Sequence, residues 1–575
     1  MNRTGEDNVN GSQNSPGDVS RRDFLKGSLV AGSVSVGSLG AFYFGYEAAV
    51  AEPLRVGVIG TGDEGSVLIG AINPDFVRVV SIADIRPYSI HRAFHGDHYS
   101  DAALAVRCGL MASYDWKTED EARRHVKVYE NENGDYQQLI ANAKKDGVEA
   151  VIIALPLHLH ALAAIEAMRA GLHVLTEKLM AHSVAECKEM ARVAQETGLH
   201  LATGHQRHYN ILYAEAVDKI RRGELGDLHY VRAQWHRGNV PGSDSWQQPM
   251  PRDAKPDDPL ADRLEKDLRS WEGRLKSARG LEIDAWQKKV AQKRAQIADA
   301  LLSDKAVPLG YQDMEIPKSK LYDTYKRPAV EELLRWRLWN RTGGGLMVEL
   351  GSHQLDAASI FIQAAHGGEK QHPLNVAAIA NRPIFGADRE VEDHIVCMFE
   401  FPAPGYDPKD PHSSRKKIGV QYASINGNGF GGYGEIVFGT KGTLILEREQ
   451  ELKTPDGGGS SSVRASGGGG ATMDTQASGE MVQMQSSGPA NVSRGYTEEI
   501  EHWAWCIRNP APENKPRCHP KVALADAVIA LTTNIAAALG KQVDFQKEWF
   551  DPNSDEVPES LLDPKALKPD VARYS

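Results

Sequence analysis

The chain has 575 residues, 41% of them hydrophobic and 7% aromatic, so it is long enough to form two domains with separate cores and insertions. Its formal net charge is -11 and it has no dense Lys/Arg tract, which argues against nucleic acid as a partner. The five cysteines contain no C-x-x-C pair and predict neither a zinc site nor a disulfide framework. One disulfide, between Cys506 and Cys518, stays open as an alternative.

The N-terminus carries an export pattern. Ser20-Arg21-Arg22-Asp23-Phe24-Leu25-Lys26 follows a polar stretch and precedes a mild apolar run rich in Gly and Ser. Residues 1–51 therefore look like a twin-arginine signal peptide that ends in an A-x-A cleavage pattern at Ala49-Val50-Ala51. We expect a periplasmic or otherwise exported protein, with the twin-arginine export machinery as a partner. The alternative is an uncleaved signal that anchors the protein to the membrane.

A glycine-rich loop follows the first predicted strand. Residues 54–59 are a short apolar run, and the loop from Gly60 to Gly65 leads directly into a helix start. Gly60 permits a tight turn, Gly62 lets the backbone approach a pyrophosphate, and Gly65 allows close packing of helix on strand. The sequence therefore predicts a dinucleotide site that includes Gly60, Thr61, Gly62 and Gly65.

An acidic residue ends the second predicted strand, residues 77–84. Asp84 lies about twenty residues beyond the glycines, where a carboxylate accepts the ribose hydroxyls of the cofactor. This position favours NAD. Arg86 is close enough to contact a 2′-phosphate, so NADP remains the less favoured alternative.

Three further predicted strands, residues 148–155, 172–176 and 199–203, also end in residues that can contact a ligand. The carboxyl ends of parallel strands meet at one edge of a sheet, which is where open α/β sheets bind ligands. Between the last two strands, Ser183 and Glu186 form a capping box that starts a helix. The residues at this edge are Gly60, Asp84, Pro156, Lys178 and His205.

Several motifs together resemble the glucose–fructose oxidoreductase/inositol dehydrogenase (Gfo/Idh/MocA) family. They are the glycine loop, Pro156-Leu157-His158-Leu159-His160, the segment from Ala170 to Glu177-Lys178, and the segment from Gly343 to Asp356. The resemblance implies an α/β protein, with an N-terminal Rossmann doubly wound parallel sheet at residues 52–180. A C-terminal α+β domain with an open, mostly antiparallel sheet follows at 181–453. It also implies a homo-oligomer.

The resemblance places Lys178 beside the nicotinamide and the substrate hydroxyl, although Leu179 stands where the family has proline. It also pairs an acidic residue with a histidine four positions later, here Glu349 and His353, where the family usually has aspartate. A helix starting at Leu346 would place Glu349, His353 and Asp356 on one face. The bland alternative is a solvated helix face whose histidine is capped by its own glutamate.

These residues define a predicted mechanism. His353 removes the hydroxyl proton, Lys178 stabilises the developing oxyanion and Glu349 orients the imidazole, with exchange of the first two roles as an alternative. The predicted substrate-binding residues are Asp356, His205 and Arg207. No metal is predicted, because His158, His160 and His205 lack a matching carboxylate pattern. The predicted cofactor-binding residues are Gly60, Thr61, Gly62, Gly65, Asp84, Arg86, Pro156, His160, Glu177 and Lys178.

Two insertions interrupt the second domain. Residues 241–335 carry apolar side chains at helical spacing on either side of Gly280, which predicts a charged helical hairpin that is a lid, a subunit contact or a solvated decoration. Residues 454–494 are rich in Gly and Ser and are expected to be disordered. Residues 495–575 are expected to hold closing helices and a tail.

The predicted function is an NAD(P)-dependent oxidoreductase (a sugar or polyol dehydrogenase) that moves a hydride between a tightly bound nicotinamide cofactor and a sugar or polyol. Tight binding is expected because free NAD is scarce outside the cytoplasm. One alternative is a redox-neutral, NAD-dependent glycoside hydrolase that oxidises its sugar transiently. Another is a non-catalytic binding protein on the same scaffold.

Overall fold

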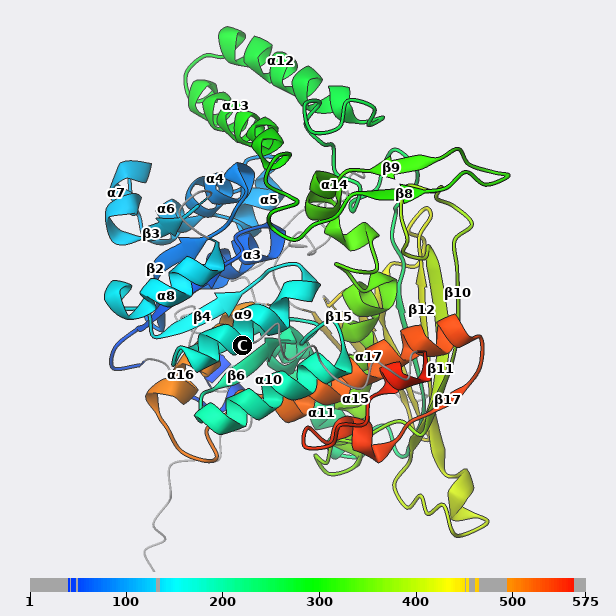
Figure 1. Ribbon diagram of the computed structural model, residues 1–575. Helices are drawn as coiled ribbons and strands as arrows, with labels where there is room; N and C mark the ends of the chain where they lie inside the picture. Colours follow the sequence, from blue (N-terminus) through cyan, green and yellow to red (C-terminus); the bar gives the residue numbers. More distant parts are fainter. Residues whose placement is uncertain are drawn as a thin grey trace, which may run out of the picture.

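The computed structural model describes residues 40–41, 43–47, 50–130, 135–449, 451–454, 461–464 and 494–562. The arginine pair of the expected export signal lies outside these residues, as does most of the predicted disordered stretch. Within the described part, two sheets stand side by side, with helices packed around each (Figure 1).

The first sheet is a six-stranded parallel sheet with the order β3-β2-β1-β4-β5-β6. This is the doubly wound arrangement predicted from the sequence. Its strands are short runs of mostly apolar and β-branched residues that are buried on both faces of the sheet, and helices connect them along the chain. The sheet continues past residue 180, the predicted boundary, because β6 pairs with β5. The strands are β1 (Leu54–Ile59), β2 (Val77–Ala83), β3 (Lys127–Tyr129), β4 (Ala150–Ile153), β5 (His173–Glu177) and β6 (Leu201–Gly204).

Helices connect these strands, and their ends follow local capping rules. In α10 the Ser183 side chain accepts from the Glu186 backbone N–H, and Glu186 bonds back to Ser183, which confirms the predicted capping box. Gly198 ends that helix in the left-handed conformation. The helices of this part are α3 (Asp63–Ala71), α4 (Pro87–His95), α5 (Asp101–Val106), α6 (Leu110–Ser113), α7 (Glu119–His125), α8 (Tyr136–Asp146), α9 (His160–Arg169), α10 (Val184–Thr197) and α11 (Ile211–Arg221).

The second sheet has nine strands in the order β16-β15-β14-β13-β7-β12-β11-β10-β17. All its pairs are antiparallel except β12 with β7, so the predicted mostly antiparallel sheet is confirmed. The strands are β7 (Leu228–Trp235), β10 (Asn375–Asn381), β11 (His394–Pro402), β12 (Lys417–Ile425), β13 (Tyr433–Gly439), β14 (Thr443–Glu447), β15 (Glu451–Thr454), β16 (Ser461–Arg464) and β17 (Val543–Asp544).

Burial alternates along these strands, so one face of the second sheet is covered and the other faces solvent. Helices α15 (Ser352–Ala365) and α17 (Pro520–Leu539) pack on the covered face. Helix α17 is long and apolar enough to cross a membrane, but 72% of its apolar window is buried inside the protein, as in a core helix. Helix α16 (Tyr496–Arg508) returns to the first sheet and contacts α3.

The insertion at 241–335 forms the predicted helical hairpin, α12 (Ala261–Ser277) and α13 (Glu282–Ala298). The hairpin projects above the first domain, and α13 packs against α4 (Figure 1). The rest of the insertion adds the small β8 (Met314–Ile316) and β9 (Tyr325–Arg327) ribbon and α14 (Ala329–Leu334). The insertion therefore packs against the first domain and does not simply extend into solvent.

Two segments next to predicted boundaries are part of the folded domains. Ser461–Arg464, inside the stretch expected to be disordered, forms β16 because it pairs with β15. Within the predicted signal peptide, Tyr43, Phe44 and Tyr46 are only 4–5% exposed and belong to the core of the first domain. The Tyr46 hydroxyl donates to Glu501 at 2.5 Å, and the Phe44 ring lies 5.6 Å from that of Tyr209.

Candidate functional site

A cavity of about 440 Å³ lies where the carboxyl ends of the parallel strands face the second sheet. This size is typical of sites for small organic ligands. Three parts of the chain line it: the glycine loop and strand ends of the first domain, β7 and the start of α15 in the second domain, and the insertion. The residues that matter for chemistry are Gly60, Gly62, Glu64, Asp84, Arg86, Pro156, His160, Glu177, Lys178, Trp235, Arg237, Arg337, Glu349 and His353.

The glycine loop has the shape that its sequence predicts. A Cβ atom at Gly60 would lie 2.4 Å from the Ala154 carbonyl oxygen, and one at Gly65 would lie 2.0 Å from the Gly60 carbonyl oxygen. At Gly62, by contrast, a Cβ atom would meet nothing within 4 Å. Two glycines thus allow tight packing of α3 on β1, and the third leaves open space beside the backbone at the N-terminus of α3.

Asp84 is held by the loop and by its own strand end. One carboxylate oxygen accepts from the Thr61 backbone N–H at 2.7 Å and the other accepts from the Arg86 backbone N–H at 2.8 Å. Thr61 is fully buried and is absent from the cavity lining. Thr61, which the sequence places in contact with the cofactor, therefore acts by positioning Asp84.

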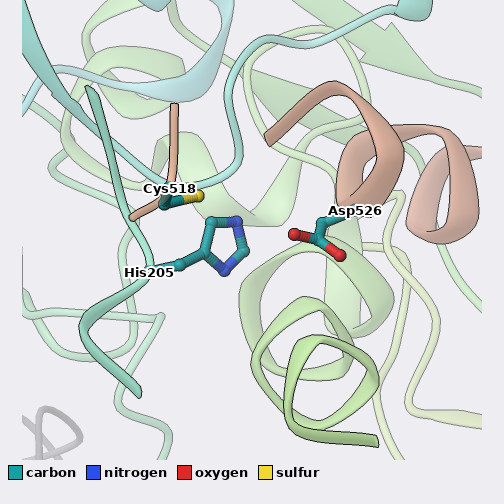
Figure 2. Close-up of side chains that lie close together, drawn as sticks. All are labelled: His205, Cys518 and Asp526. Atoms are coloured by element: carbon teal, nitrogen blue, oxygen red, sulfur yellow. The ribbon is translucent and has the colours of Figure 1, made fainter. Parts of the chain in front are cut away.

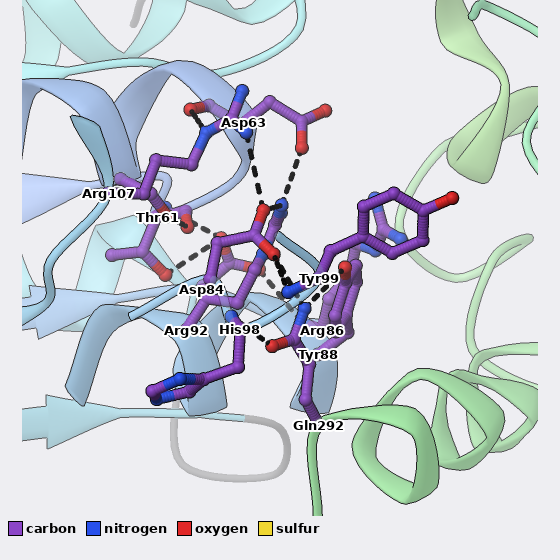
Figure 3. A network of polar contacts seen from close by, with 12 residues as sticks. Thr61, Asp63, Asp84, Arg86, Tyr88, Arg92, His98, Tyr99, Arg107 and Gln292 are labelled. Carbon is purple, nitrogen blue, oxygen red and sulfur yellow. Dashed lines mark hydrogen bonds and ion pairs between the residues drawn. The ribbon is translucent and has the colours of Figure 1, made fainter. Parts of the chain in front are cut away.

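The Arg86 side chain is already paired with the insertion. Its Nε and Nη2 atoms donate to one oxygen of Asp299 at 3.0 and 2.8 Å, and the other oxygen accepts from the Tyr88 backbone N–H. Asp299 immediately follows α13, and its side chain is 2% exposed. Figure 3 shows Arg86 and Tyr88 in this network, next to Gln292 of α13.

A second part of the same network supports the glycine loop (Figure 3). Asp63, in the first turn of α3, accepts from Arg92 at 2.7 Å, and its backbone carbonyl accepts from Arg107 at 3.0 Å. Both arginines lie near Asp97, which also accepts from Gln292 of α13 at 2.7 Å. The Arg92 and Arg107 charges outweigh the effect of burial and hold the pKa of Asp63 low. The insertion therefore also buttresses the loop.

Lys178 and His353 reach the cavity from the two domains. Lys178 follows β5, and its Nζ donates to the Glu349 carbonyl at 3.0 Å; the Lys178–Leu179 peptide bond is cis. His353 is 4% exposed, and its Nδ1 has no hydrogen-bond partner among the described residues. Burial, reinforced by the Lys178 charge, holds the pKa of His353 well below its usual value. The imidazole is therefore neutral near pH 7 and able to accept a proton.

Glu349 does not contact His353 as the sequence predicts; its carboxylate accepts from Arg337 at 2.9 Å. The physical reason is a π-helical turn at Met347–Gly351, just before α15. A π turn takes more residues than an α turn, so it rotates Glu349 away from the face that His353 occupies. Arg337 and Lys178 outweigh burial and lower the pKa of Glu349, which keeps it a carboxylate. Glu349 thus positions Arg337 and, through its carbonyl, Lys178.

The three predicted substrate-binding residues do not line the cavity. Asp356 accepts from His208 at 2.9 Å and lies 3.6 Å from His205. Arg207 pairs with Glu449 at 2.6 Å. All of these side chains are buried except that of His208, which is 11% exposed. They lie behind the cavity wall because α15 turns Asp356 toward the end of β6, so their predicted contact with a substrate is not seen in this arrangement.

Pro156, His160, Glu177 and Lys178 do line the cavity, whereas Gly65, which packs against Gly60, does not. The two ring nitrogens of His160 lie 2.9 and 2.8 Å from the carbonyls of Leu179 and Leu155, so this histidine ties together the two loops that carry Pro156 and Lys178. Glu177 is buried and accepts from the Lys178 backbone N–H at 3.1 Å. Burial raises the pKa of Glu177 well above its usual value, and neighbouring Glu64 adds to the shift.

Several lining residues escape the sequence prediction. Arg237 follows β7 two residues after Trp235, and burial lowers its pKa to about 10. Arg337 lies just beyond the insertion, and Trp246 and Tyr311 lie within it. The run Trp235-His236-Arg237 at a strand end is a signal that could have identified the first of these. The positions of the other three residues depend on how the insertion folds back over the cavity, and no local sequence pattern indicates this.

Comparisons with known proteins agree with this geometry. Residues 54–205 match the Gfo/Idh/MocA family, described as "Oxidoreductase family, NAD-binding Rossmann fold". The chain is 28% identical over 181 residues to 1-carboxy-3-chloro-3,4-dihydroxycyclo hexa-1,5-diene dehydrogenase of Comamonas testosteroni, covering 31% of this chain and 37% of that one. It is 24% identical over 227 residues to a glycosyl hydrolase family 109 protein of Solibacter usitatus, covering 38% and 46%.

Among solved structures, an inositol dehydrogenase homolog complexed with NAD+ from Azotobacter vinelandii is similar, with a TM-score of 0.52 and 14% identity. That match covers 86% of this chain and 98% of the other, and it shows a shared fold. The two curated relatives named above are matched over less than half their length.

Proposed function

We propose that the protein transfers a hydride between a tightly held NAD and a hydroxyl or ketone carbon of a sugar or polyol, since residues 54–205 match the Gfo/Idh/MocA oxidoreductase family. One observation carries this proposal. The glycine loop, Lys178 and His353 line a single cavity, although they come from different domains. A dinucleotide site thus adjoins a cation and a neutral base, the two groups that oxidation of a hydroxyl requires.

The residues present fit a dinucleotide. The open space at Gly62 and the N-terminus of α3 would accept the pyrophosphate, and Asp84 would accept ribose hydroxyls. Pro156, His160 and Glu177 line the part of the cavity between the loop and Lys178. When bound, the nicotinamide ring supplies the hydride acceptor or donor.

Side chains of the protein would accept the substrate hydroxyl proton and stabilise the negative charge that develops on its oxygen. His353, held neutral by burial, takes the proton from the substrate hydroxyl. Lys178, fixed through the Glu349 carbonyl, stabilises the oxygen as it gains negative charge. Because the imidazole is neutral, it has a free lone pair for the proton, which is the reason for giving the base role to the histidine. Trp235, with its ring 5.6 Å from His353, forms an apolar wall that limits water.

The insertion supports tight cofactor binding. Leu309 and Tyr311 from the insertion line the cavity together with Asp84 and Arg86, and Asp299 and Gln292 tie the insertion to the same edge. A nucleotide seated at this edge would leave only if these contacts opened. A protein exported with its cofactor inside would need such retention, with a second substrate to reset the cofactor in place.

The first test is to purify the protein from its host without added nucleotide, denature it and identify the released nucleotide by mass spectrometry. We expect about one NAD or NADH per chain. The same preparation, incubated with C-deuterated sugars and polyols, should carry deuterium on its nicotinamide. A protein that emerges nucleotide-free and exchanges no deuterium with added NAD across a broad panel would contradict the proposal.

Glu64 should make nucleotide binding depend on pH. It lines the cavity in the first turn of α3, and burial raises its pKa to about 7, against the lowering effect of Lys178. The side chain is therefore largely neutral below pH 7 and becomes an anion near the pyrophosphate above it. Because like charges repel, we expect NAD to dissociate roughly 3- to 10-fold faster at pH 8 than at pH 6. Exchange against isotopically labelled NAD measures this rate.

The matched control is Glu64→Gln, which keeps the shape and cannot ionise. Its exchange rate should stay flat over the same pH range. An equal pH dependence in the wild-type and Glu64→Gln proteins would assign the effect to another group.

A second candidate is supported by the similarity to glycosyl hydrolase family 109 proteins. Redox-neutral cleavage of a glycoside would use the same His353 and Lys178 during transient oxidation of the sugar. Release of nitrophenol from a nitrophenyl glycoside without net NADH would select this activity over the dehydrogenase. A non-catalytic binding protein would keep its biological effect when Lys178 and His353 are both replaced.

A further inference from the structure

A buried group of metal-ligand side chains lies behind the cavity, where the end of β6 meets α17. His205 follows β6, Cys518 lies just before α17, and Asp526 lies within it. One ligand atom from each residue lies within 4.8 Å of the other two (Figure 2). The side chains converge from three segments of the chain, and their residues are only 0–2% exposed.

Polar atoms in this group lack partners. Both ring nitrogens of His205 and Oδ2 of Asp526 have no hydrogen-bond partner among the described residues. Burying a polar atom without a partner is unfavourable, so native proteins satisfy nearly all such atoms. One nitrogen of His205 and Oδ2 of Asp526, both without a partner and close to the Cys518 thiol, indicate a bound ligand that accepts lone pairs.

The surrounding residues have the arrangement of a second shell. Asp356 Oδ2 lies 3.6 Å from Nδ1 of His205, which leaves Nε2 for a cation. Metal-binding histidines commonly place a carboxylate at their other nitrogen in this way. The other oxygen of Asp356 accepts from His208 at 2.9 Å. Lys370 Nζ donates to Oδ1 of Asp526 at 2.6 Å, so Oδ2 remains for the ion.

We infer that His205, Cys518 and Asp526 bind one Zn²⁺ ion. A thiol, an imidazole and a carboxylate together suit zinc, whereas Mg²⁺ and Ca²⁺ take oxygen ligands. On binding, Cys518 loses its proton to solvent and the thiolate sulfur coordinates the ion. Zinc–ligand distances of about 2.0–2.3 Å would draw the three side chains inward.

The site would be structural. None of its three ligands lines the cavity, and the ion would join the last strand of the parallel sheet to α17, which packs on the second sheet. The Thr203 backbone N–H already donates to the Cys518 carbonyl at 3.1 Å, so the two segments are in register before any ion binds. Zinc would therefore clamp the two domains together behind the active site.

The test measures metal in the full chain, purified without chelator from cells grown with zinc. Elemental analysis by mass spectrometry should find about one zinc per chain. Cobalt substituted for the zinc should give the absorption of a tetrahedral site with a thiolate-to-cobalt charge-transfer band. His205→Ala and Cys518→Ser should each lower the zinc content at least 10-fold, and Cys518→Ser should abolish the charge-transfer band.

Cys187→Ser, at an equally buried cysteine in α10, is the control and should keep the full zinc content. If the two ligand variants fail to fold, wild-type protein stripped of metal and titrated with Co²⁺ still reports the thiolate ligand. Protein that holds under a tenth of an equivalent of zinc and gives no cobalt spectrum would overturn the inference. Zinc content unchanged in both His205→Ala and Cys518→Ser would overturn it as well.

Discussion

Replacing His353 by alanine is expected to lower kcat by roughly 10²- to 10⁴-fold, the usual contribution of a general base. His353 lines the cavity, is nearly fully buried, and has a pKa held well below its usual value by burial and Lys178. It is therefore in the base form throughout the neutral range. Single-turnover oxidation of a substrate identified by deuterium exchange, followed by nicotinamide absorbance, measures the loss.

Lys178 gives this prediction a second readout. Because the Lys178 charge helps to lower the pKa of His353, Lys178→Met should raise that pKa and move the acid limb of kcat/KM to higher pH. His229→Ala, at an exposed position on β7, is the control and should leave kcat unchanged. An acid limb that stays in place in Lys178→Met would remove His353 from the role of base.

The second large effect is expected for cofactor choice. In the wild-type protein Asp299 neutralises Arg86, the cation beside Asp84 that could bind a 2′-phosphate. Asp299→Asn should release Arg86 while its amide oxygen still accepts from Tyr88. A charge-assisted bond is worth about 1.5–3 kcal/mol, so the preference for NADP over NAD should rise roughly 10- to 100-fold. Dissociation constants for both nucleotides on nucleotide-free protein measure it.

Two further variants test whether Arg86 causes the change in cofactor preference. Asp267→Asn removes the carboxylate that pairs with Lys293 in the same hairpin at 3.2 Å, and should leave the preference as in wild type. Adding Arg86→Ala to Asp299→Asn should cancel the gain. NADP affinity that rises equally in the double variant would show that Arg86 is not the phosphate ligand.

Local patterns in the sequence predict the first domain well. The glycine loop, the Asp84 strand end and the Ser183 capping box each depend on residues a few positions apart, and each is present in the structure. The order of the parallel strands follows from the alternation of short apolar runs with helices. The helical hairpin of the insertion is also correct, because its apolar side chains repeat at helical spacing.

The errors arise where distant residues decide the outcome. The assignment of Glu349 assumed a regular α-helix, and the π turn at Met347–Gly351 depends on packing against β12. Asp299 pairs with Arg86 across 213 positions in the chain. The proposed zinc ligands His205, Cys518 and Asp526 come from distant parts of the chain and have no spacing that a sequence pattern could indicate.

Tyr43, Phe44 and Tyr46 lie within the predicted signal peptide, yet they belong to the core of the folded first domain. These rings are buried against α16 and the end of the first sheet, so side-chain packing ties the segment just before the predicted cleavage position to the first domain. A protease cutting after Ala51 would sever three buried side chains from the chain, each contributing about 1.5–3 kcal/mol. If cleavage occurs at this position, the first domain loses this packing, whereas an uncleaved chain keeps it.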